Sequence, residues 1–362
     1  MDSTTACLDF AAIGHQDSWK NITRFVNGLR KPGQERLSDD TVKNIFAFLP
    51  PTEVFKVNVR SVTGATINGV YVETFIDPDK LDARFGRHNL AKVLEAVNHV
   101  EKMGSKVATL GGFTSIVLEG DLDLLQQRKT SLTTGNTLTA AFIVKGVEEA
   151  AELVGIDLQA ANLLIIGATG DIGSACATYF AGRVEKLLLC ARKQLPLQEL
   201  VLSLSKKQVS VHGSTNIAEF SQQADVIISV ASSAGIRLPK LKSGVLICDA
   251  GYPKNLEQSL DDSLDGHLFH GGMGQVSGGF SFSPDYSSSI YEYPAPFTIH
   301  GCILEAMILA FEQRWENYSS GKGKITTEKM EEIYSLSLKH GITIAPFFDS
   351  AGCWAPLKKL YA

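Results

Sequence analysis

Residues 162–175 read Asn-Leu-Leu-Ile-Ile-Gly-Ala-Thr-Gly-Asp-Ile-Gly-Ser-Ala. An apolar run meets three glycines spaced three apart, a pattern that predicts a strand, a tight turn and a helix. Gly167 would permit the turn, Gly170 would let the backbone approach a pyrophosphate, and Gly173 would let the helix pack on the sheet. The same pattern occurs at ordinary strand–turn–helix corners, but the strand before it and the helix after it favour a dinucleotide site. The predicted contacts are Gly167, Ala168, Thr169, Gly170, Asp171, Ile172 and Gly173.

The strand predicted at residues 187–190 indicates which dinucleotide binds. Proteins that prefer NAD carry an acidic residue about 20 residues beyond the glycines, where it binds the ribose hydroxyls. This chain instead has Arg192 and Lys193 there. A guanidinium and an ammonium suit a 2′-phosphate, so the pair favours NADPH. The alternative is that both are solvated surface cations.

Alternating strands and helices around this turn predict a parallel sheet with helices on both faces. Two later turns, at residues 229–233 and 249–254, follow apolar strands, and ligands bind at such carboxyl ends. We therefore add Ser232 and Gly251 to the cofactor site. The predicted strands are residues 162–166, 187–190, 209–212, 226–230 and 245–249.

The rest of the chain predicts a second domain. The first 50 residues look polar and irregular, with one short helix near residues 40–49, and residues 271–296 look like a loop or linker. Strands are expected at 54–62, 70–76 and 106–110, the first two as a hairpin, and helices at 79–103, 134–154, 298–315 and 327–340. The predicted fold class is α/β, with a Rossmann-type parallel sheet domain (residues 158–294) inserted between N-terminal α/β and C-terminal helical parts (residues 1–157 plus 295–362) of a substrate domain.

Composition narrows the function classes. The 362 residues are 44% hydrophobic and 20% charged, with a formal net charge of −5, which argues against nucleic-acid binding. No run approaches the roughly 20 apolar residues of a membrane span, and the first residues do not resemble a signal peptide. The six cysteines are scattered without a CxxC pair, so we expect no metal site and a cytoplasmic protein.

Cys302 is the sharpest candidate for chemistry. It should lie in the first turn of the apolar helix after residues 294–296, where the helix dipole would lower the pKa of its thiol. A thiolate attacks thioesters well, and the resulting enzyme thioester can accept a hydride. The alternative is an ordinary core cysteine. His300 would point away from Cys302 on a helix, so it could be a partner only if that turn is not yet helical.

Several motifs together resemble one family. They are residues 108–117 (Ala-Thr-Leu-Gly-Gly-Phe-Thr-Ser-Ile-Val), 133–137 (Thr-Thr-Gly-Asn-Thr), 167–175 and 251–256 (Gly-Tyr-Pro-Lys-Asn-Leu), with Arg60-Ser-Val-Thr-Gly64, Gly69-x-Tyr-Val-Glu73 and Cys302 followed by Glu305. This set, from about residue 54 to residue 341, resembles the long-chain acyl-[acyl-carrier-protein] reductase family. The first 50 residues match no pattern of that family, and residues 274–296 are richer in Gly, Ser and Tyr than expected.

The resemblance implies NADPH-dependent reduction of a fatty acyl thioester to a fatty aldehyde through an acylated cysteine, which maps onto Cys302. It implies an acyl-carrier protein, or coenzyme A, as the thioester donor, and leaves room for a partner enzyme that consumes the aldehyde. Asn136 would position nicotinamide or substrate or cap a helix, and Lys254 would assist electrostatically. The carrier is acidic, and the cations Arg84, Arg87 and Lys92 are the expected docking patch, with a solvated helix face as the alternative.

Two other functions fit the same two-domain plan. One is an NADP oxidoreductase of the shikimate or methylene-folate dehydrogenase type, which needs no covalent intermediate. The other is a regulatory protein that binds NADPH and performs no reaction. Only the reductase interpretation requires the thiol of Cys302.

Overall fold

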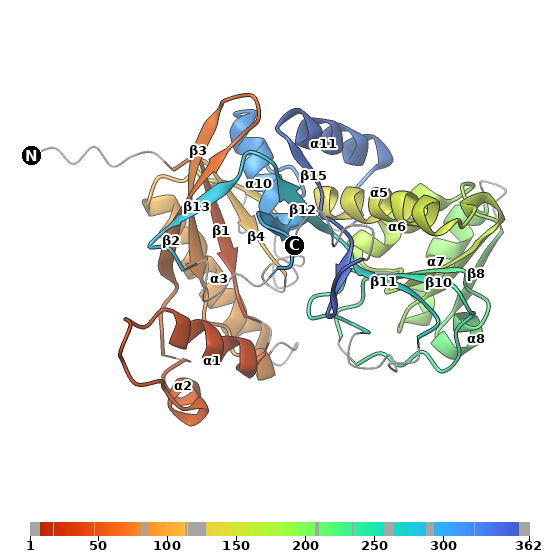
Figure 1. Cartoon of the computed structure of the whole chain (residues 1–362), viewed down its shortest axis with the longest axis horizontal. Coiled ribbons are helices and arrows are strands. Elements are labelled where there is room, and N and C mark those ends of the chain that lie inside the picture. Colours follow the sequence, from red (N-terminus) through yellow and green to blue (C-terminus); the bar gives the residue numbers. More distant parts are fainter. Residues whose placement is uncertain are drawn as a thin grey trace, which may run out of the picture.

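The computed structural model describes residues 8–16, 18–46, 48–80, 85–112, 114, 128–206, 210–233, 235–256, 264–286, 293–321 and 323–354. Arg84 and Cys7 lie outside these ranges. Two six-stranded sheets dominate the described chain, one on the left and one on the right of Figure 1. The prediction of a mixed α/β fold is confirmed.

The first sheet has the strand order β13-β2-β3-β1-β4-β5. Strands β1, β3, β4 and β5 run parallel, whereas β2 and β13 add an antiparallel edge. Helix α3 covers one face and α10 the other, because apolar side chains alternate along the strands. The bounds are β1 (Phe10–Gly14), β2 (Thr52–Arg60), β3 (Thr66–Glu73), β4 (Val107–Leu110), β5 (Ser131–Thr133), β13 (Phe280–Ser283), α3 (Gly86–Lys102) and α10 (Gly301–Phe311).

The second sheet is entirely parallel, with the order β11-β10-β9-β6-β7-β8. Counted from β6, this is the 3-2-1-4-5-6 arrangement of a Rossmann sheet, and its switch point lies between β6 and β9. Helices α5, α6 and α7 pack on one face, and α8 packs on the other. The bounds are β6 (Asn162–Ile166), β7 (Lys186–Cys190), β8 (Val211–Ser214), β9 (Val226–Ser229), β10 (Val245–Asp249), β11 (Gly266–His270), α5 (Asn136–Val154), α6 (Asp171–Phe180), α7 (Gln194–Ser205) and α8 (Ile217–Ser221).

The segment expected to be a linker contains strands instead. β12 (Met273–Val276) pairs with β14 (Thr298–His300) and β15 (Ile342–Ile344), while β13 closes the edge of the first sheet. The helix predicted from residue 298 therefore begins only at Gly301. The division into residues 158–294 and the flanking parts stays a prediction, and the pairing of β13 with β2 indicates that the chain returns to the first sheet before residue 294.

The N-terminal region is also more ordered than expected. β1 is the central parallel strand of the first sheet, and α1 (Trp19–Gly28) follows it, whereas the expected short helix is α2 (Asp39–Phe46). The sequence did not predict β1 because this strand has only five residues and lies in a polar region.

The C-terminal part spans both sheets. Helix α11 (Thr327–Lys339) lies against α5 and α6, and the small ribbon of β16 (Phe348–Asp349) and β17 (Gly352–Cys353) lies beside β11. Trp354 anchors the end of this ribbon by donating a 2.8 Å hydrogen bond to the Leu268 carbonyl. In the described part of the chain, no helix combines the length and apolar character that crossing a membrane requires.

Lys92 does not belong to a docking patch. It is buried on α3, and its ammonium donates hydrogen bonds to the carbonyl oxygens of Phe75 (2.7 Å) and Leu49 (3.3 Å). Burial lowers the pKa of Lys92. The sequence prediction failed here because the spacing of cations on a helix does not show which of them turns inward; Arg87 is exposed at the start of the same helix.

Glu73, at the end of β3, is a fully buried carboxyl that accepts hydrogen bonds from Tyr71 Oη (2.8 Å), Gln16 Nε2 (3.1 Å) and the Phe75 N–H (3.2 Å). Burial raises the pKa of Glu73 from 4.5 to about 7, despite these donors. Between these two pH values the folded protein keeps a proton that the unfolded chain releases. The contribution of Glu73 to stability is therefore present below pH 4.5 and is lost as the pH rises towards 7.

We predict that Glu73→Gln removes this pH dependence. The free energy of unfolding of the variant, relative to that of the unmodified protein, should rise by about 3 kcal/mol between pH 4.5 and pH 8. Urea unfolding at both pH values measures it. Glu35→Gln, which replaces an exposed carboxyl, is the control and should show little change. A constant stability difference between Glu73→Gln and the unmodified protein across this range would contradict the burial argument.

Candidate active site

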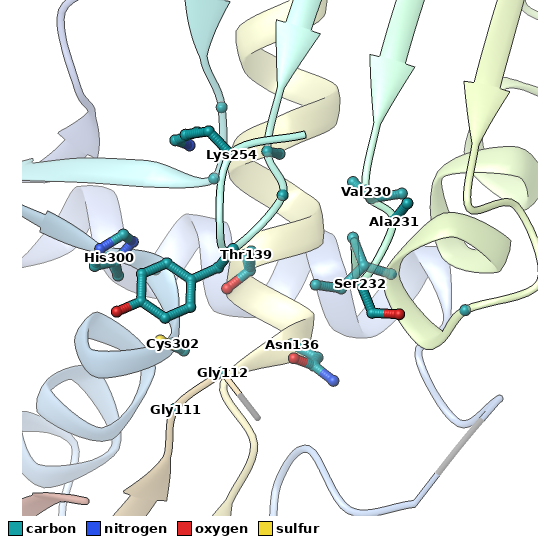
Figure 2. A pocket seen from close by; sticks show the side chains of 18 of the residues that line it. Gly111, Gly112, Asn136, Thr139, Val230, Ala231, Ser232, Lys254, His300 and Cys302 are labelled. Atoms are coloured by element: carbon teal, nitrogen blue, oxygen red, sulfur yellow. The ribbon is translucent and has the colours of Figure 1, made fainter. Parts of the chain in front are cut away.

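A cavity of about 760 Å³ lies where the carboxyl ends of the two sheets face each other. Figure 2 shows Cys302, Gly111 and Gly112 on one side, Val230, Ala231 and Ser232 on the other, and Asn136 and Thr139 between them. Most of the residues predicted from sequence line it: Asn136, Gly167, Thr169, Gly170, Asp171, Ile172, Arg192, Lys193, Ser232, Gly251 and Cys302. Ala168 and Gly173 do not line the cavity; both are buried beneath the turn.

The glycine turn has the geometry of a phosphate-binding loop. Gly167 has φ of +87°, and a Cβ there would lie 2.8 Å from the Val230 carbonyl oxygen. A Cβ at Gly173 would lie 2.2 Å from the Gly167 carbonyl oxygen, so α6 packs against the turn only without a side chain. Because α6 begins at Asp171, its first N–H groups lie at the cavity, as an anionic pyrophosphate requires.

The basic pair lies at the end of β7. Arg192 and Lys193 are exposed and line the cavity, and Arg192 donates a 3.3 Å hydrogen bond to Ser232 Oγ across the switch point. Two cations and a hydroxyl beside the phosphate-binding turn fit a dinucleotide that carries an additional phosphate.

A buried amide holds the neighbouring turns in place. Asn255 accepts hydrogen bonds from Ser229 Oγ (2.8 Å) and the Ala231 N–H (2.9 Å), and it donates to the carbonyls of Ala231 and Ser233. Asp249 accepts from the N–H groups of Gly251, Asn255 and Leu256. Sequence reasoning passed over Asn255, although it lies within the Gly-Tyr-Pro-Lys-Asn-Leu motif, because nothing in the motif shows that its side chain turns inward.

Asn136 lines the cavity but does not cap α5, whose N-cap is Gly135; a role in positioning nicotinamide or substrate stays a prediction. It is the first residue of α5, and its side chain donates a 2.9 Å hydrogen bond to Asp171 Oδ2 at the start of α6. The other oxygen of Asp171 accepts from the Gly323 N–H (3.0 Å). Asn136 therefore ties the two helix starts together at the wall of the cavity.

Cys302 is the second residue of α10 and is half-buried, whereas the other described cysteines, Cys176, Cys190, Cys248 and Cys353, are buried. The expectation of a lowered thiol pKa is wrong for this structure. Burial raises the pKa of Cys302 to about 11, and the charge of Glu305 adds to the rise. The N–H groups of Ile303 and Gly112 favour the thiolate, but desolvation outweighs them.

The backbone around Cys302 is held by close contacts. Gly135 has φ of +71°, and a Cβ there would lie 2.2 Å from Cys302 Cα. Thr109 Oγ1 donates a 2.7 Å hydrogen bond to the Cys302 carbonyl. Glu305, one turn along α10, is fully buried and accepts hydrogen bonds from Thr133 Oγ1 and, at 2.8 Å, from the Leu138 N–H. The residue 133–137 motif thus fixes the start of α10, a role that its spacing alone did not indicate.

His300 was expected to be a possible partner of Cys302 only outside the helix, and it does precede the helix. It lies in β14 as the N-cap of α10, in an extended conformation. Its Nε2 shares a 2.9 Å hydrogen bond with Tyr293 Oη, and its ring lies 5.5 Å from that of Tyr252. Burial, with a smaller effect of the Lys254 charge, lowers the pKa of His300 to about 4, so its imidazole is neutral at pH 7. The Lys254 ammonium donates a 3.0 Å hydrogen bond to the Asp249 carbonyl.

One branch of the cavity is apolar and runs between α10 and the first sheet. Phe55 stacks on Tyr71, with ring centroids 5.1 Å apart, and also contacts Phe282. Such a lining suits a hydrocarbon chain. It includes Phe10, Phe25, Phe55, Val57, Tyr71, Phe282, Ile303 and Met307.

Several known proteins are similar to this chain. A family model described as shikimate / quinate 5-dehydrogenase matches residues 148–270. A long-chain acyl-[acyl-carrier-protein] reductase of Synechococcus elongatus is 36% identical over 344 residues, 92% of this chain and 97% of that protein. Aminotransferase PigE of a Serratia species is 25% identical over 296 residues, which are 80% of this chain but 34% of PigE. The crystal structure of shikimate 5-dehydrogenase from Listeria monocytogenes aligns over 92% of this chain and 98% of that one, with a TM-score of 0.38 and 11% identity.

We predict that Gly135→Ala destabilises the protein more than Gly155→Ala. Both glycines flank α5 with positive φ, so alanine costs each about 1–2 kcal/mol of backbone strain. A Cβ at Gly155 meets nothing within 4 Å, whereas one at Gly135 collides with Cys302. The clash should add about 1–3 kcal/mol, measured by urea unfolding. Equal losses in the two variants would show that α5 and α10 are not in the contact described.

Proposed function

The chain belongs to the long-chain acyl-[acyl-carrier-protein] reductase family, and from this premise we propose that it reduces a long-chain acyl thioester, borne by an acyl-carrier protein, to the fatty aldehyde with NADPH, through an acyl group carried on Cys302. The chain is an oxidoreductase, as its motifs predicted. One observation carries the proposal: Cys302, the apolar branch and the glycine turn line one cavity, and Cys302 is the one described cysteine that is only partly buried.

The dinucleotide would be held by the chain's own groups at the second sheet. The N–H groups at the start of α6 and the turn from Gly167 to Gly170 would take the pyrophosphate. Arg192, with Ser232 and Lys193 beside it, would take the 2′-phosphate that distinguishes NADPH. When bound, NADPH supplies the hydride for reduction of the acyl carbon.

Acylation begins with the thiol of Cys302. Its sulfur forms a bond to the acyl carbon, the bond from that carbon to the carrier's sulfur breaks, and the carrier leaves as a thiol with the proton that Cys302 gives up. Burial raises the pKa of Cys302, so the thiol is the starting form in this proposal and its proton leaves during the attack. The acyl chain would extend along the branch lined by Phe55, Tyr71 and Phe282.

The same helix start stabilises the tetrahedral oxygen. Once the acyl carbon is reduced, its oxygen carries negative charge, and the N–H groups beside the Cys302 sulfur are placed to donate to it. Collapse breaks the carbon–sulfur bond and releases the aldehyde. Cys302 returns as a thiolate and takes up one proton, so each turnover consumes one proton.

The shikimate-type alternative receives support only for the cofactor half of the chain, because that family model ends at residue 270 and does not reach Cys302. The regulatory alternative would leave the apolar branch without a role. We expect the reaction to take place in the cytoplasm, with coenzyme A as a second donor and with an enzyme that consumes the aldehyde.

Replacing the sulfur tests the reaction directly. Cys302→Ala should form no acyl adduct by intact-protein mass spectrometry and release no aldehyde from acyl-carrier thioester and NADPH. Cys176→Ala, which removes a buried thiol from α6 outside the cavity, should retain both activities. Aldehyde formation by Cys302→Ala at the normal rate would favour reduction without a covalent intermediate.

Removing the guanidinium tests the cofactor. Arg192→Ala should raise the KM for NADPH about 10- to 100-fold, since a hydrogen bond to a charged group contributes about 1.5–3 kcal/mol, and should leave the KM for NADH nearly unchanged. Lys206→Ala, which removes an exposed cation beyond the other end of α7, is the matched control. An equal effect on both dinucleotides would place Arg192 away from the 2′-phosphate.

A further inference from the structure

A second cavity, of about 520 Å³, lies on the other side of His300 from the main one. The two cavities share four lining residues: Tyr252, Lys254, Tyr293 and His300. The side chains of these residues therefore form a partition with one cavity on each face. The proposed function gives this second cavity no role.

The partition lies next to the reactive sulfur. His300 precedes Cys302 by two residues, and it shares a hydrogen bond with Tyr293, which also lines both cavities. On the Cys302 side, a Cβ at Gly112 would lie 3.2 Å from the Tyr252 ring, and the N–H of Gly112 faces the Cys302 sulfur. Tyr252 and His300, which line both cavities, thus lie close to Cys302.

An acyl thioester attacked at Cys302 needs three directions of approach. The acyl chain occupies the branch beside Phe55 and Tyr71, and the dinucleotide occupies the side that carries Gly167 and Arg192. The bond from the acyl carbon to the donor's own sulfur points in a third direction, away from both the acyl chain and the dinucleotide. The second cavity adjoins the main cavity at His300, two residues before Cys302, and offers this third direction.

The lining of this cavity suits a polar, flexible arm better than a hydrocarbon. Hydroxyl, imidazole and ammonium groups from Tyr293, Ser350, His270 and Lys254 can donate to or accept from amide groups, while Met273 and Phe348 offer apolar contacts. Its volume lies within the range of small-molecule sites.

We propose that this second cavity is the passage for the pantetheine arm that carries the acyl group, whether the arm belongs to a carrier protein or to coenzyme A. The assignment rests on the proposed function, since only a thioester donor has such an arm. The outer lip of the passage is the turn between β16 and β17, where Asp349 Oδ1 accepts a 2.8 Å hydrogen bond from the Ala351 N–H. Ser350 in this turn is exposed and lines the cavity, whereas Ala351 is exposed and does not line it.

This turn offers a matched pair of variants. Ser350→Trp should obstruct the passage, and Ala351→Trp should add the same bulk outside it. Each protein is mixed with two donors, palmitoyl-coenzyme A or palmitoyl-carrier thioester, and palmitoyl thiophenyl ester, which has no arm. Acylation of Cys302 is followed by intact-protein mass spectrometry, with Cys302→Ala as the background and thermal unfolding as the check of folding.

Ser350→Trp should slow acylation from both pantetheine-borne donors about tenfold, because the transition state would bind less well. It should leave the rate from the thiophenyl ester unchanged. Ala351→Trp should change neither rate. S-methylpantetheine should compete with palmitoyl-coenzyme A but not with the thiophenyl ester, and less effectively in Ser350→Trp.

The assignment would be overturned if Ser350→Trp slowed acylation equally from all donors. It would also be overturned if Ser350→Trp did not slow the pantetheine-borne donors and S-methylpantetheine did not compete. A response to palmitoyl-coenzyme A but not to palmitoyl-carrier thioester would restrict the passage to the free cofactor and overturn it for the carrier. If the unmodified protein accepts the acyl group from no donor, the proposed function itself fails, and that result is distinct from the others.

Discussion

The site depends on the contact between two helix starts. Gly135, before α5, lies so close to Cys302 in α10 that no side chain fits between their backbones. Helix α5 packs on the second sheet and α10 on the first, so this contact sets the position of the thiol relative to the dinucleotide turn. Glu305 and Thr133 fasten the same junction from within. The geometry of the cleft is thus built on backbone packing and one buried carboxyl, not on flexible side chains.

The same burial that fixes Cys302 also makes its thiol a poor acid. At pH 7 a thiol with a pKa of about 11 holds its proton. In the proposed acylation, the proton of Cys302 leaves with the carrier's sulfur. Two N–H groups, those of Ile303 and Gly112, lie beside the sulfur and favour its thiolate. In the proposed mechanism the same groups would also donate to the oxygen of the tetrahedral species.

The sequence predicted the second sheet well because its strands are continuous apolar runs and its glycines allow a turn that a side chain would obstruct. It identified Cys302, Arg192 and the glycine turn, which the structure brings to one cavity. It missed β1, β12 and β13, since these short strands gain their stability from neighbours distant in sequence. It also missed Asn255, and it misjudged the Cys302 pKa, because inward orientation and desolvation depend on packing that local patterns do not record.

The most direct test is a crystal structure of the protein after incubation with palmitoyl thioester in the absence of NADPH. The account predicts continuous electron density from the Cys302 sulfur into the branch lined by Phe55, Tyr71 and Phe282. Density for a palmitoyl group attached to another residue, or a free acyl chain elsewhere with an unmodified Cys302, would contradict it.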